Sequence, residues 1–363
     1  MRVLFLTRKH PPSVGGMQRV SYHLITEMKP RAEVIAVTWG GSQVFLPLFL
    51  PYALVKSVVV GRDVDLVHAG DAVMASVGWI LGKLLNAPVV VTVHGLDITL
   101  PFKPYQWFIP RLLRDLDHVV CVSNSTLKAC ERRRIPPEKC TVIHNGVSVP
   151  AVTASQESAR RQLSQILQRD IHGERVLLTV GRLVRRKGVH WFTERVLPRV
   201  LAADPDVRYV VVGSGPMASD IRSVASHPSV SGKVHLLGRV SDHDLDHLYA
   251  AADLFIMPNL PVPGDMEGFG LVALEAAAHG LPVLAADLEG IRDAVIPEQT
   301  GWLLEPGEID SWVSRVLEAL DDPDSLRRIG QLGPATARQR FAWKNMVDAY
   351  EDLFRRLTGS LES

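Results

Sequence analysis

The sequence predicts an α/β protein with two Rossmann-like, doubly wound domains, each a parallel sheet covered by helices on both faces. Short apolar runs alternate with longer segments of helical periodicity along the whole chain. Most of the short runs are continuously apolar, which is typical of parallel strands that are buried on both sides. With 363 residues, the chain is also long for a single hydrophobic core.

The expected strands fall into two groups, one in each half of the chain. In the first half they are Val3–Leu6, Val34–Val37, Leu66–His68, Val89–Val93, Val119–Val122 and Thr141–Ile143. In the second half they are Val176–Val180, Tyr209–Val212, Val234–Leu237, Leu254–Met257 and Pro282–Ala285. The helices between successive strands imply right-handed crossovers. The break near Asn145-Gly146-Val147 predicts one domain over residues 1–148 and a second over 149–342. Ligands are expected in a cleft between the domains, at the carboxyl ends of the strands.

The composition is that of a globular protein, with 47% apolar and 22% charged residues. Cys121, Cys130 and Cys140 have no metal-site spacing and cannot all pair, so reduced thiols in a cytoplasmic protein are expected. The first apolar run has four residues, too few for a signal peptide. Residues 44–60 are the most apolar region, but Pro47 and Pro51 interrupt them, and we expect no spanning helix.

Charge is distributed unevenly between the two halves. Residues 1–150 contain 17 Lys and Arg against 10 Asp and Glu, and the remainder contains 23 against 29. A basic first half favours an acidic partner, although a solvated surface explains the same excess. The run Arg132-Arg133-Arg134 is too short to indicate nucleic acid, and no nucleic-acid partner is expected.

One stretch near the end of the second half combines two carboxylates with a helix start. Glu267 precedes Gly268 and Gly270, and a helical run from Leu271 carries Glu275 about one turn in. The free N–H groups of a helix start bind anions. Carboxylates accept hydrogen bonds from sugar hydroxyls. The stretch therefore predicts a ligand that is part phosphate and part sugar.

Two motifs in the first half follow expected strands. Gly15-Gly16 comes after the first strand and precedes a helical pattern, so its backbone could approach a ligand closely. His94 ends the strand Val89–Val93, with Asp97 close by, and could hydrogen-bond a sugar hydroxyl or the reacting centre. An ordinary turn and a structural histidine are the alternatives.

Three motifs in the second half also follow strands. Arg182 and Lys187 lie in one loop and could converge on a single anion, since Arg offers a fork of donors and Lys a point charge. The motif Gly213-Ser214-Gly215-Pro216 lacks the third glycine of a dinucleotide fingerprint, which disfavours a nicotinamide dehydrogenase. Arg239 and Val240 end another strand, where a nucleobase could stack.

Taken together, these motifs resemble those of the family 4 (group 1) glycosyltransferases, which have the two-domain GT-B fold. The resemblance covers nearly the whole chain. It rests on Gly15-Gly16, His94-Gly95-Leu96-Asp97, Asn145-Gly146-Val147, Gly181-Arg182 with Lys187-Gly188, Gly213-Ser214-Gly215-Pro216, and Glu267 with Glu275. It implies a retaining transfer of a mannose- or glucose-type sugar from a nucleotide-diphosphate sugar, without a metal or other cofactor. Within the family, the chain resembles the lipid-linked and phosphatidylinositol mannosyltransferases.

The resemblance also implies roles for individual residues. Arg182 and Lys187 would hold the diphosphate, Glu275 the ribose and Glu267 the transferred sugar. Other donor contacts would come from Gly16, Gly213, Arg239, Val240, Gly268, Phe269, Gly270, Leu271 and Val272. Gly15, His94 and Asp97 would lie on the sugar and acceptor side. Direct front-face attack and a double displacement through Glu267 or Asp97 both stay open. A final helix at about 343–357 would pack back on the first domain.

The acceptor side has two apolar stretches, residues 44–60 and 103–114. The second mixes aromatic and basic residues, as interfacial segments do. They predict an enzyme on the cytoplasmic face of an anionic membrane, acting on a lipid-borne or glycan acceptor; packing inside the first domain is the alternative. A nucleotide-sugar epimerase or hydrolase, and a sugar-nucleotide-binding protein without catalysis, are the other functions considered.

Overall fold

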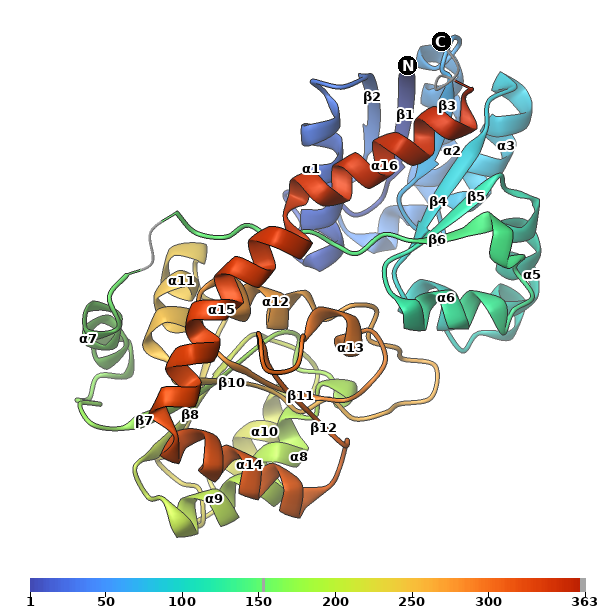
Figure 1. The fold of residues 1–363 in the computed structure, drawn as a ribbon. Coiled ribbons are helices and arrows are strands. Elements are labelled where there is room, and N and C mark those ends of the chain that lie inside the picture. The colour runs from blue at the N-terminus through green and yellow to red at the C-terminus, as the bar shows by residue number, and fades with distance from the viewer. Residues whose placement is uncertain (152–153, 360–363) are drawn as a thin grey trace. The chain divides into compact units, whose positions relative to one another are not determined.

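The computed structural model describes residues 1–151 and 154–359, which form two compact units. Unit 1 consists of Met1–Gly146, Pro263–Phe269 and the C-terminal segment from Phe341. Unit 2 consists of Val147–Val262 and Gly270–Arg340. The sequence assigned residues 149–342 to one domain, whereas the structure groups the short loop 263–269 with unit 1. Each unit contains one parallel sheet, as predicted, and each sheet has six strands (Figure 1).

The sheet of unit 1 has the strand order β2-β1-β3-β4-β5-β6. Its strands are β1 (Arg2–Thr7), β2 (Glu33–Thr38), β3 (Leu66–Ala69), β4 (Val89–Val93), β5 (His118–Cys121) and β6 (Cys140–Val142). The order reverses between β1 and β3. Such a switch point is where open α/β sheets usually bind ligands, outside the carboxyl ends of the strands.

Helices cover both faces of this sheet. On one face lie α1 (Gly16–Met28) and α16 (Trp343–Leu357), which pack side by side (Figure 1). Phe5 of β1 points to this face, with its ring 6.2 Å from that of Phe354 in α16. On the other face lie α2 (Leu46–Val60), α3 (Ala75–Leu85), α5 (Lys103–Asp115) and α6 (Asn124–Glu131). The short α4 (Leu96–Thr99) follows β4.

The most apolar run of the chain forms one continuous helix, so the expectation that its prolines keep it short of a spanning length was wrong. A 3₁₀ turn (Gln43–Phe45) continues directly into α2, and together they are long and apolar enough to cross a membrane. Pro47 does not break the helix because it lies in the first turn, where its missing N–H has no intrahelical acceptor. Pro51 removes one interior hydrogen bond only.

The sheet of unit 2 has the strand order β12-β11-β10-β7-β8-β9. Its strands are β7 (Arg175–Val180), β8 (Val207–Val212), β9 (Val234–Gly238), β10 (Leu254–Met257), β11 (Val283–Ala286) and β12 (Gly301–Leu304). Numbered from its own first strand, this is the order of a dinucleotide-binding fold, with the switch point between β7 and β10. The sequence missed β12, and the ends of the other strands agree with the predicted ones to within two residues.

The remaining helices belong mainly to unit 2. One face of its sheet is covered by α8 (Val189–Trp191), the π-helical turn Phe192–Val196, α9 (Leu197–Ala203), α10 (Ala218–Ala225) and α14 (Ile309–Asp321). The other face is covered by α7 (Gln156–Leu167), α11 (Asp242–Ala251), α12 (Leu271–Ala278) and α13 (Ile291–Ala294). The 19-residue α15 (Pro323–Phe341) precedes α16.

Candidate functional site

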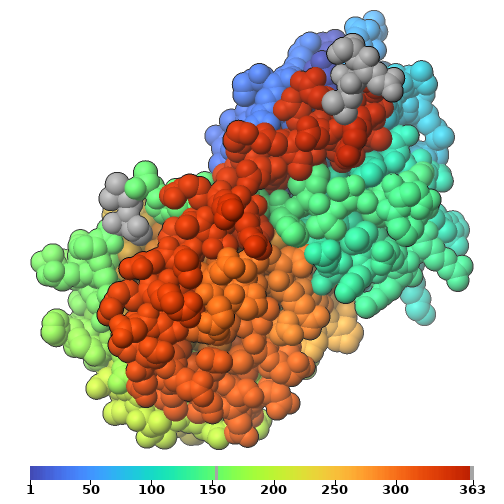
Figure 2. Space-filling view, viewed as in Figure 1, coloured from blue at the N-terminus to red at the C-terminus, as the bar shows by residue number. Residues whose placement is uncertain are grey.

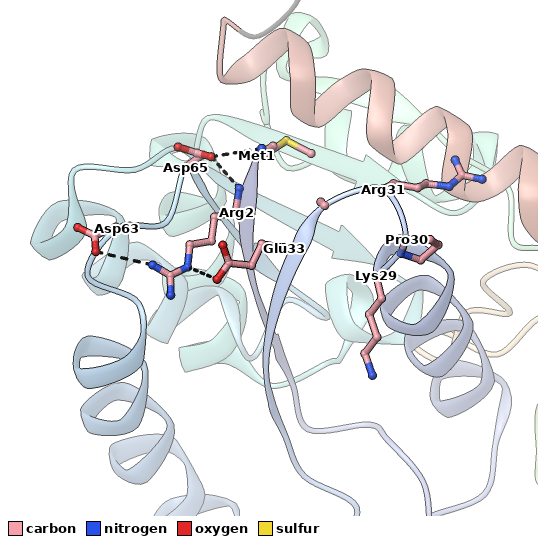
Figure 3. A pocket seen from close by; sticks show the side chains of 9 residues that line it. Met1, Arg2, Lys29, Pro30, Arg31, Glu33, Asp63 and Asp65 are labelled. Carbon is pink, nitrogen blue, oxygen red and sulfur yellow. Dashed lines mark hydrogen bonds and ion pairs between the residues drawn. The ribbon is translucent and has the colours of Figure 1, made fainter.

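One open hollow in unit 1 lies at the amino ends of the strands, opposite to the edge where open α/β sheets usually bind ligands. It has a volume of about 700 Å³ and borders the amino ends of β1 and β2. Figure 3 shows that several of its charges are paired within the hollow: the Arg2 guanidinium lies 2.9 Å from Glu33 and 3.7 Å from Asp63, and the terminal amine lies 3.9 Å from Asp65. The predicted site residues are instead found at the carboxyl ends of the strands in both units.

In unit 2, the loops that follow β7 and β10 pack together at the switch point. Gly188 has a φ of +65°, and a Cβ atom there would lie 1.7 Å from the Pro258 carbonyl oxygen. The Leu260 N–H donates to the Arg186 carbonyl at 2.8 Å. Glycine is therefore required at 188, because any side chain would separate the two loops.

Arg182 and Lys187 share the loop after β7. The 3₁₀ turn Arg185–Lys187 folds the chain back, and a Cβ atom on Gly181 would lie 3.7 Å from the Lys187 Cε. The Lys187 side chain therefore runs back to Gly181, the residue that directly follows β7. Lys187 is only 8% exposed. Two cations thus lie at the carboxyl end of the strand, and one of them is largely withdrawn from water.

The loop after β8 packs against the loop after β7. A Cβ atom on Gly213 would lie 1.8 Å from the Gly181 carbonyl oxygen, and the Leu183 N–H donates to the Ser214 carbonyl at 3.0 Å. The Ser214 hydroxyl accepts a hydrogen bond from Nε of Arg239 at 3.2 Å. Arg239 and the neighbouring Val240, which follow β9, are thus tied to the loop that carries Gly213.

Helix α12 begins at the carboxyl side of β10 and carries Glu275 one turn in, as the sequence predicted. Gly270 precedes the helix in the left-handed conformation with a φ of +86°, and it has no side chain to cap the first N–H groups. The amides of Leu271 and Val272 are in the first turn, which has no intrahelical acceptors. The Glu275 carboxylate accepts a hydrogen bond from the Tyr249 hydroxyl at 3.2 Å. Tyr249, in α11, fixes this carboxylate and was not predicted from the sequence.

In unit 1, the imidazole of His94 follows β4 and has a defined tautomer. Its Nε2 lies 3.0 Å from the Gly70 carbonyl oxygen, which can only accept a hydrogen bond. Nε2 therefore carries the proton, and in the neutral ring Nδ1 is left as an acceptor. His94 is half-buried.

Asp97 holds the backbone around His94. Its carboxylate accepts hydrogen bonds from the His94 N–H at 2.7 Å and from the Ala72 N–H at 3.1 Å. Burial raises the pKa of the Asp97 carboxyl group. The nearby His94 opposes this shift, and the negative charge of Asp71 adds to it. The Tyr105 hydroxyl donates to the Asp97 carbonyl at 2.5 Å. Asp97 therefore joins the loops that follow β3 and β4.

Asp71 and Arg8 form a buried ion pair that sequence reasoning missed. Arg8 follows β1 and Asp71 follows β3, and the guanidinium Nε lies 2.9 Å from the carboxylate. The other oxygen of Asp71 accepts the N–H groups of Val73 and Met74. The pair connects the two strands on either side of the switch point. In the sequence, the only indication of this pair is that Arg8 and Asp71 lie within two residues of the end of a strand.

The loop 263–269 contacts the segment around His94 within unit 1. A Cβ atom on Gly268 would lie 1.8 Å from the His94 carbonyl oxygen, and one on Gly95 would lie 2.7 Å from the Gly268 Cα. The preceding Met266 is part of the unit 1 core, and Glu267 is only 9% exposed. Phe269 stacks on His144, with 5.5 Å between ring centroids. Glu267 therefore belongs to the same region of unit 1 as His94.

The glycine pair of the first loop marks the start of α1. Gly15 precedes the helix with a φ of +156°, and Gly16 is its first residue. A Cβ atom on Gly15 would lie 2.7 Å from the Gln18 Oε1. The pair lies at the carboxyl side of β1, next in the sheet to β3 and one strand from β4, which precedes His94.

Two family models cover most of the chain. Residues 14–149 match the model described as Glycosyltransferase Family 4, and residues 164–335 match the model described as Glycosyl transferases group 1. The GDP-mannose-dependent monoacylated alpha-(1-6)-phosphatidylinositol monomannoside mannosyltransferase of Corynebacterium glutamicum is 27% identical over 390 residues, which span all of this chain and 98% of the relative. A D-inositol 3-phosphate glycosyltransferase of Segniliparus rotundus is 30% identical, over 78% of this chain and 64% of that protein.

Solved structures share the fold. Sucrose-phosphate synthase from Thermosynechococcus elongatus superposes with a TM-score of 0.81 at 22% identity, over 99% of this chain and all of that one. The Anabaena protein HepE, solved in complex with UDP, superposes with a TM-score of 0.79 at 22% identity, over 98% of this chain and all of that one. The likeness extends over both units.

Proposed function

This chain belongs to the group 1, family 4 glycosyltransferases of the GT-B fold, and from that premise we propose that it is a retaining hexosyltransferase with a lipid-borne or glycan acceptor. It is a nucleotide-sugar glycosyltransferase. The finer proposal is that it moves a mannose- or glucose-type sugar to an acceptor hydroxyl. The printed names of the relatives support this choice, since they include a GDP-mannose-dependent mannosyltransferase that acts on a phosphatidylinositol mannoside.

The arrangement at the switch point of unit 2 is the observation that carries the proposal. Lys187 and Arg182 lie at the end of β7, next to the loop that leads from β10, and α12 begins with uncapped amides. Cations and a helix start favour a diphosphate. Glu275, held by Tyr249, is an acceptor suited to ribose hydroxyls. We assign the donor to this region, with the nucleobase toward Arg239 and Val240.

The proposed chemistry breaks the bond between the anomeric carbon and the diphosphate oxygen. The acceptor oxygen bonds to the same carbon from the same face, and its proton passes to the leaving phosphate. Lys187, Arg182 and the amides of Gly270 to Val272 would stabilise the charge that develops on the diphosphate. Each such donor is worth roughly 3 kcal/mol in comparable sites. These groups would neutralise the leaving group without a metal, so we expect activity to survive EDTA.

Two groups in unit 1 would act on the transferred sugar. His94 offers Nδ1 as a hydrogen-bond acceptor because its Nε2 proton is engaged by Gly70. Glu267 belongs to the loop that contacts the His94 backbone. Asp97 has its carboxylate occupied by two backbone N–H groups, which favours a positioning role for it. Gly15 and Gly16, at the start of α1, would let the backbone approach the sugar and diphosphate.

The experiment that tests the proposal measures nucleotide release and product together. The purified protein is incubated with GDP-mannose or UDP-glucose, with and without vesicles containing a phosphatidylinositol mannoside. We expect nucleotide release to depend on the acceptor, and NMR of the product to show the anomeric configuration of the donor. The Lys187→Ala variant is the negative control, and Arg161→Ala, on the exposed face of α7, is its matched positive control.

Other outcomes would identify the alternatives. Release of nucleotide from donor alone at the same rate would indicate an epimerase or hydrolase of the same fold. Nucleotide binding without turnover of any acceptor would indicate a binding protein. A product of inverted configuration would refute retention while leaving glycosyl transfer in place.

A further inference from the structure

Large apolar side chains are exposed almost entirely on unit 1. Of the 16 such residues in the described ranges 1–151 and 154–359, only Leu332 lies in unit 2. Ten belong to α2 with its leading 3₁₀ turn, to α3 and to α5. They are Val44, Phe45, Leu48, Tyr52, Val55, Val59, Ile80, Leu84, Trp107 and Phe108. We call these ten side chains the apolar layer.

Helix α2 has a buried face and an apolar face that is exposed. Its buried residues are Phe49, Ala53 and Ser57, which are spaced four residues apart and pack toward the sheet. Its exposed residues are Leu48, Tyr52, Val55 and Val59, between 54% and 71% exposed. At 100° per residue, these four positions fall within an arc of about 60°, on the side away from the buried face. A stripe of this kind in water normally marks an interface.

The stripe is continued by the neighbouring helices. Helix α3 packs against α2 on one side and against α5 on the other, so the three helices form one layer on this face of the sheet. Ile80 and Leu84 of α3 and Trp107 and Phe108 of α5 are exposed. In the space-filling view, the cyan and blue-green atoms of α3 and α5 reach the surface of unit 1 (Figure 2). The apolar layer therefore extends over three helices.

The charges among these apolar side chains are basic. Helices α2 and α3 and the 3₁₀ turn before α2 contain no Asp or Glu, and α5 contains one, Asp115, its last residue. The same segments contain five basic residues: Lys56, Lys83, Lys103, Arg111 and Arg114. Each helix also places one cation over an aromatic ring. Lys56 lies 5.5 Å from the Tyr52 ring centroid, Lys83 lies 4.9 Å from that of Trp79, and the Arg111 guanidinium lies 4.6 Å from that of Trp107. Paired aromatic rings and cations are characteristic of segments that lie at the headgroup level of a bilayer.

We propose that the apolar layer docks unit 1 on the surface of an anionic lipid bilayer, with α2 lying along the interface rather than across it. The proposal rests on the lipid-borne acceptor of the proposed function and identifies the surface that would bring the enzyme to it. A spanning orientation conflicts with the buried face of α2, which packs on the protein core. A second copy of the chain is a poorer occupant, because it would place the same five cations against each other.

The test is flotation of the full-length protein with vesicles of phosphatidylcholine, alone or mixed with phosphatidylglycerol. We expect binding to the anionic vesicles only, and weaker binding as salt is added. The triple variant Leu48→Gln, Val55→Gln, Val59→Gln should bind at least tenfold more weakly, because these three side chains would no longer enter the interface. The matched control is Leu332→Gln, which changes an exposed leucine on unit 2 and should bind like the wild type.

The charges are tested separately from the apolar side chains. A variant with Lys56→Gln, Lys83→Gln and Arg111→Gln should lose the preference for anionic vesicles and the dependence on salt. Circular dichroism of both triple variants should match the wild type, since every substituted side chain is at the surface.

Three results would overturn the proposal. The first is that the wild type does not float with anionic vesicles. The second is that the Leu48/Val55/Val59 variant binds the vesicles as strongly as the wild type. The third is that the wild type sediments as a dimer and this variant as a monomer, which would make the apolar layer a dimer interface. Nucleotide-induced stabilisation of the same preparations separates this proposal from the proposed function. If the wild type is stabilised by nucleotide but does not float with the vesicles, the docking proposal is refuted and the donor site is not. If it floats but no nucleotide stabilises it, the donor site is refuted and the docking proposal is not.

Discussion

The two units have sheets of the same size and the same parallel pairing, but they differ in what surrounds the sheet. In unit 2, three loops from neighbouring strands are packed tightly by Gly188, Gly213 and Gly215. Among the described residues of this unit, Leu332 is the one large apolar side chain that is exposed. In unit 1, the carboxyl ends of the strands are joined by the Asp97 and Asp71 carboxylates, and one outer face is apolar and basic. The same sheet architecture therefore carries the proposed donor site in one unit and the proposed docking surface in the other.

The largest effect should come from the cations of unit 2. Lys187→Ala should lower kcat/KM by about a hundredfold to a thousandfold, because it removes the largely buried charge that we propose stabilises the leaving diphosphate. Steady-state kinetics with the best donor would measure this effect. Arg161→Ala should stay within twofold of the wild type. Nearly normal turnover by the Lys187→Ala enzyme would show that the charge of Lys187 does not contribute to catalysis.

Nucleotide binding should stabilise unit 2 more than unit 1. At a hundredfold excess over the dissociation constant, the correct nucleotide should add about 2.7 kcal/mol to the free energy of unfolding. A thermal-shift screen of UDP, GDP and ADP and their sugars would identify the base. Hydrogen exchange should then show protection in the loop 181–188 and the first turn of α12. Protection confined to unit 1 would reverse the assignment of the donor.

Unit 1 should lose stability in mild acid through His68. Its imidazole is buried, with Nε2 2.9 Å from the Thr92 hydroxyl, and burial lowers its pKa to about 3. The unfolded chain binds the proton near pH 6.5, so the folded state is favoured above that pH and loses stability as the pH falls toward 3. The loss should be about 2 kcal/mol at pH 5.

The check is urea unfolding of the wild type and the His68→Gln variant at pH 5 and pH 7.5. The glutamine amide can donate to the Thr92 hydroxyl or accept from it, but it does not take up a proton in this pH range. The difference in the free energy of unfolding between the two pH values should therefore shrink. An equal difference in both proteins would mean that other groups, such as His118, set the acid sensitivity.

The smallest effect should come from surface ion pairs. Arg31 pairs with Asp348 at 2.5 Å and Glu351 at 3.1 Å, which links the end of α1 to α16 within unit 1. Arg31→Ala should cost about 1 kcal/mol or less, since these groups are partly exposed. Arg328→Ala, which removes an exposed pair with Glu298 in unit 2, should cost less still. Urea unfolding would rank the two, and a larger loss in the Arg328 variant would contradict the ranking.

The fold class could be predicted from the sequence because buried parallel strands give continuous apolar runs. Strand β12 was missed because Gly301–Leu304 is only four residues long and begins with a glycine. The helix over residues 46–60 was obscured by its prolines, whose effect depends on where the helix begins. These errors arise where local sequence does not specify the tertiary packing that stabilises the element.

The candidate site was predictable only in part. Motifs directly after strands, such as Arg182 and His94, are indicated by their position because such loops share one edge of the sheet. The contact between Gly95 and Gly268 joins residues that are distant in sequence, so a single sequence does not specify it. The same holds for Tyr249 beside Glu275 and for the Arg8–Asp71 pair, whose partners come from different elements.

The position of α16 has a consequence for synthesis of the chain. This last helix covers the sheet that the first residues form, beside α1, with Phe354 and Tyr350 packed near Phe5 and His68. Unit 2 is complete in sequence once Arg340 has been made, whereas unit 1 still lacks the helix that covers half of one face. During translation, the apolar side chains that α16 covers would therefore stay exposed until residues 343–357 have been made, which is after unit 2 is complete. Holding chaperones would be needed most by the nascent N-terminal region, because uncovered apolar surface promotes aggregation.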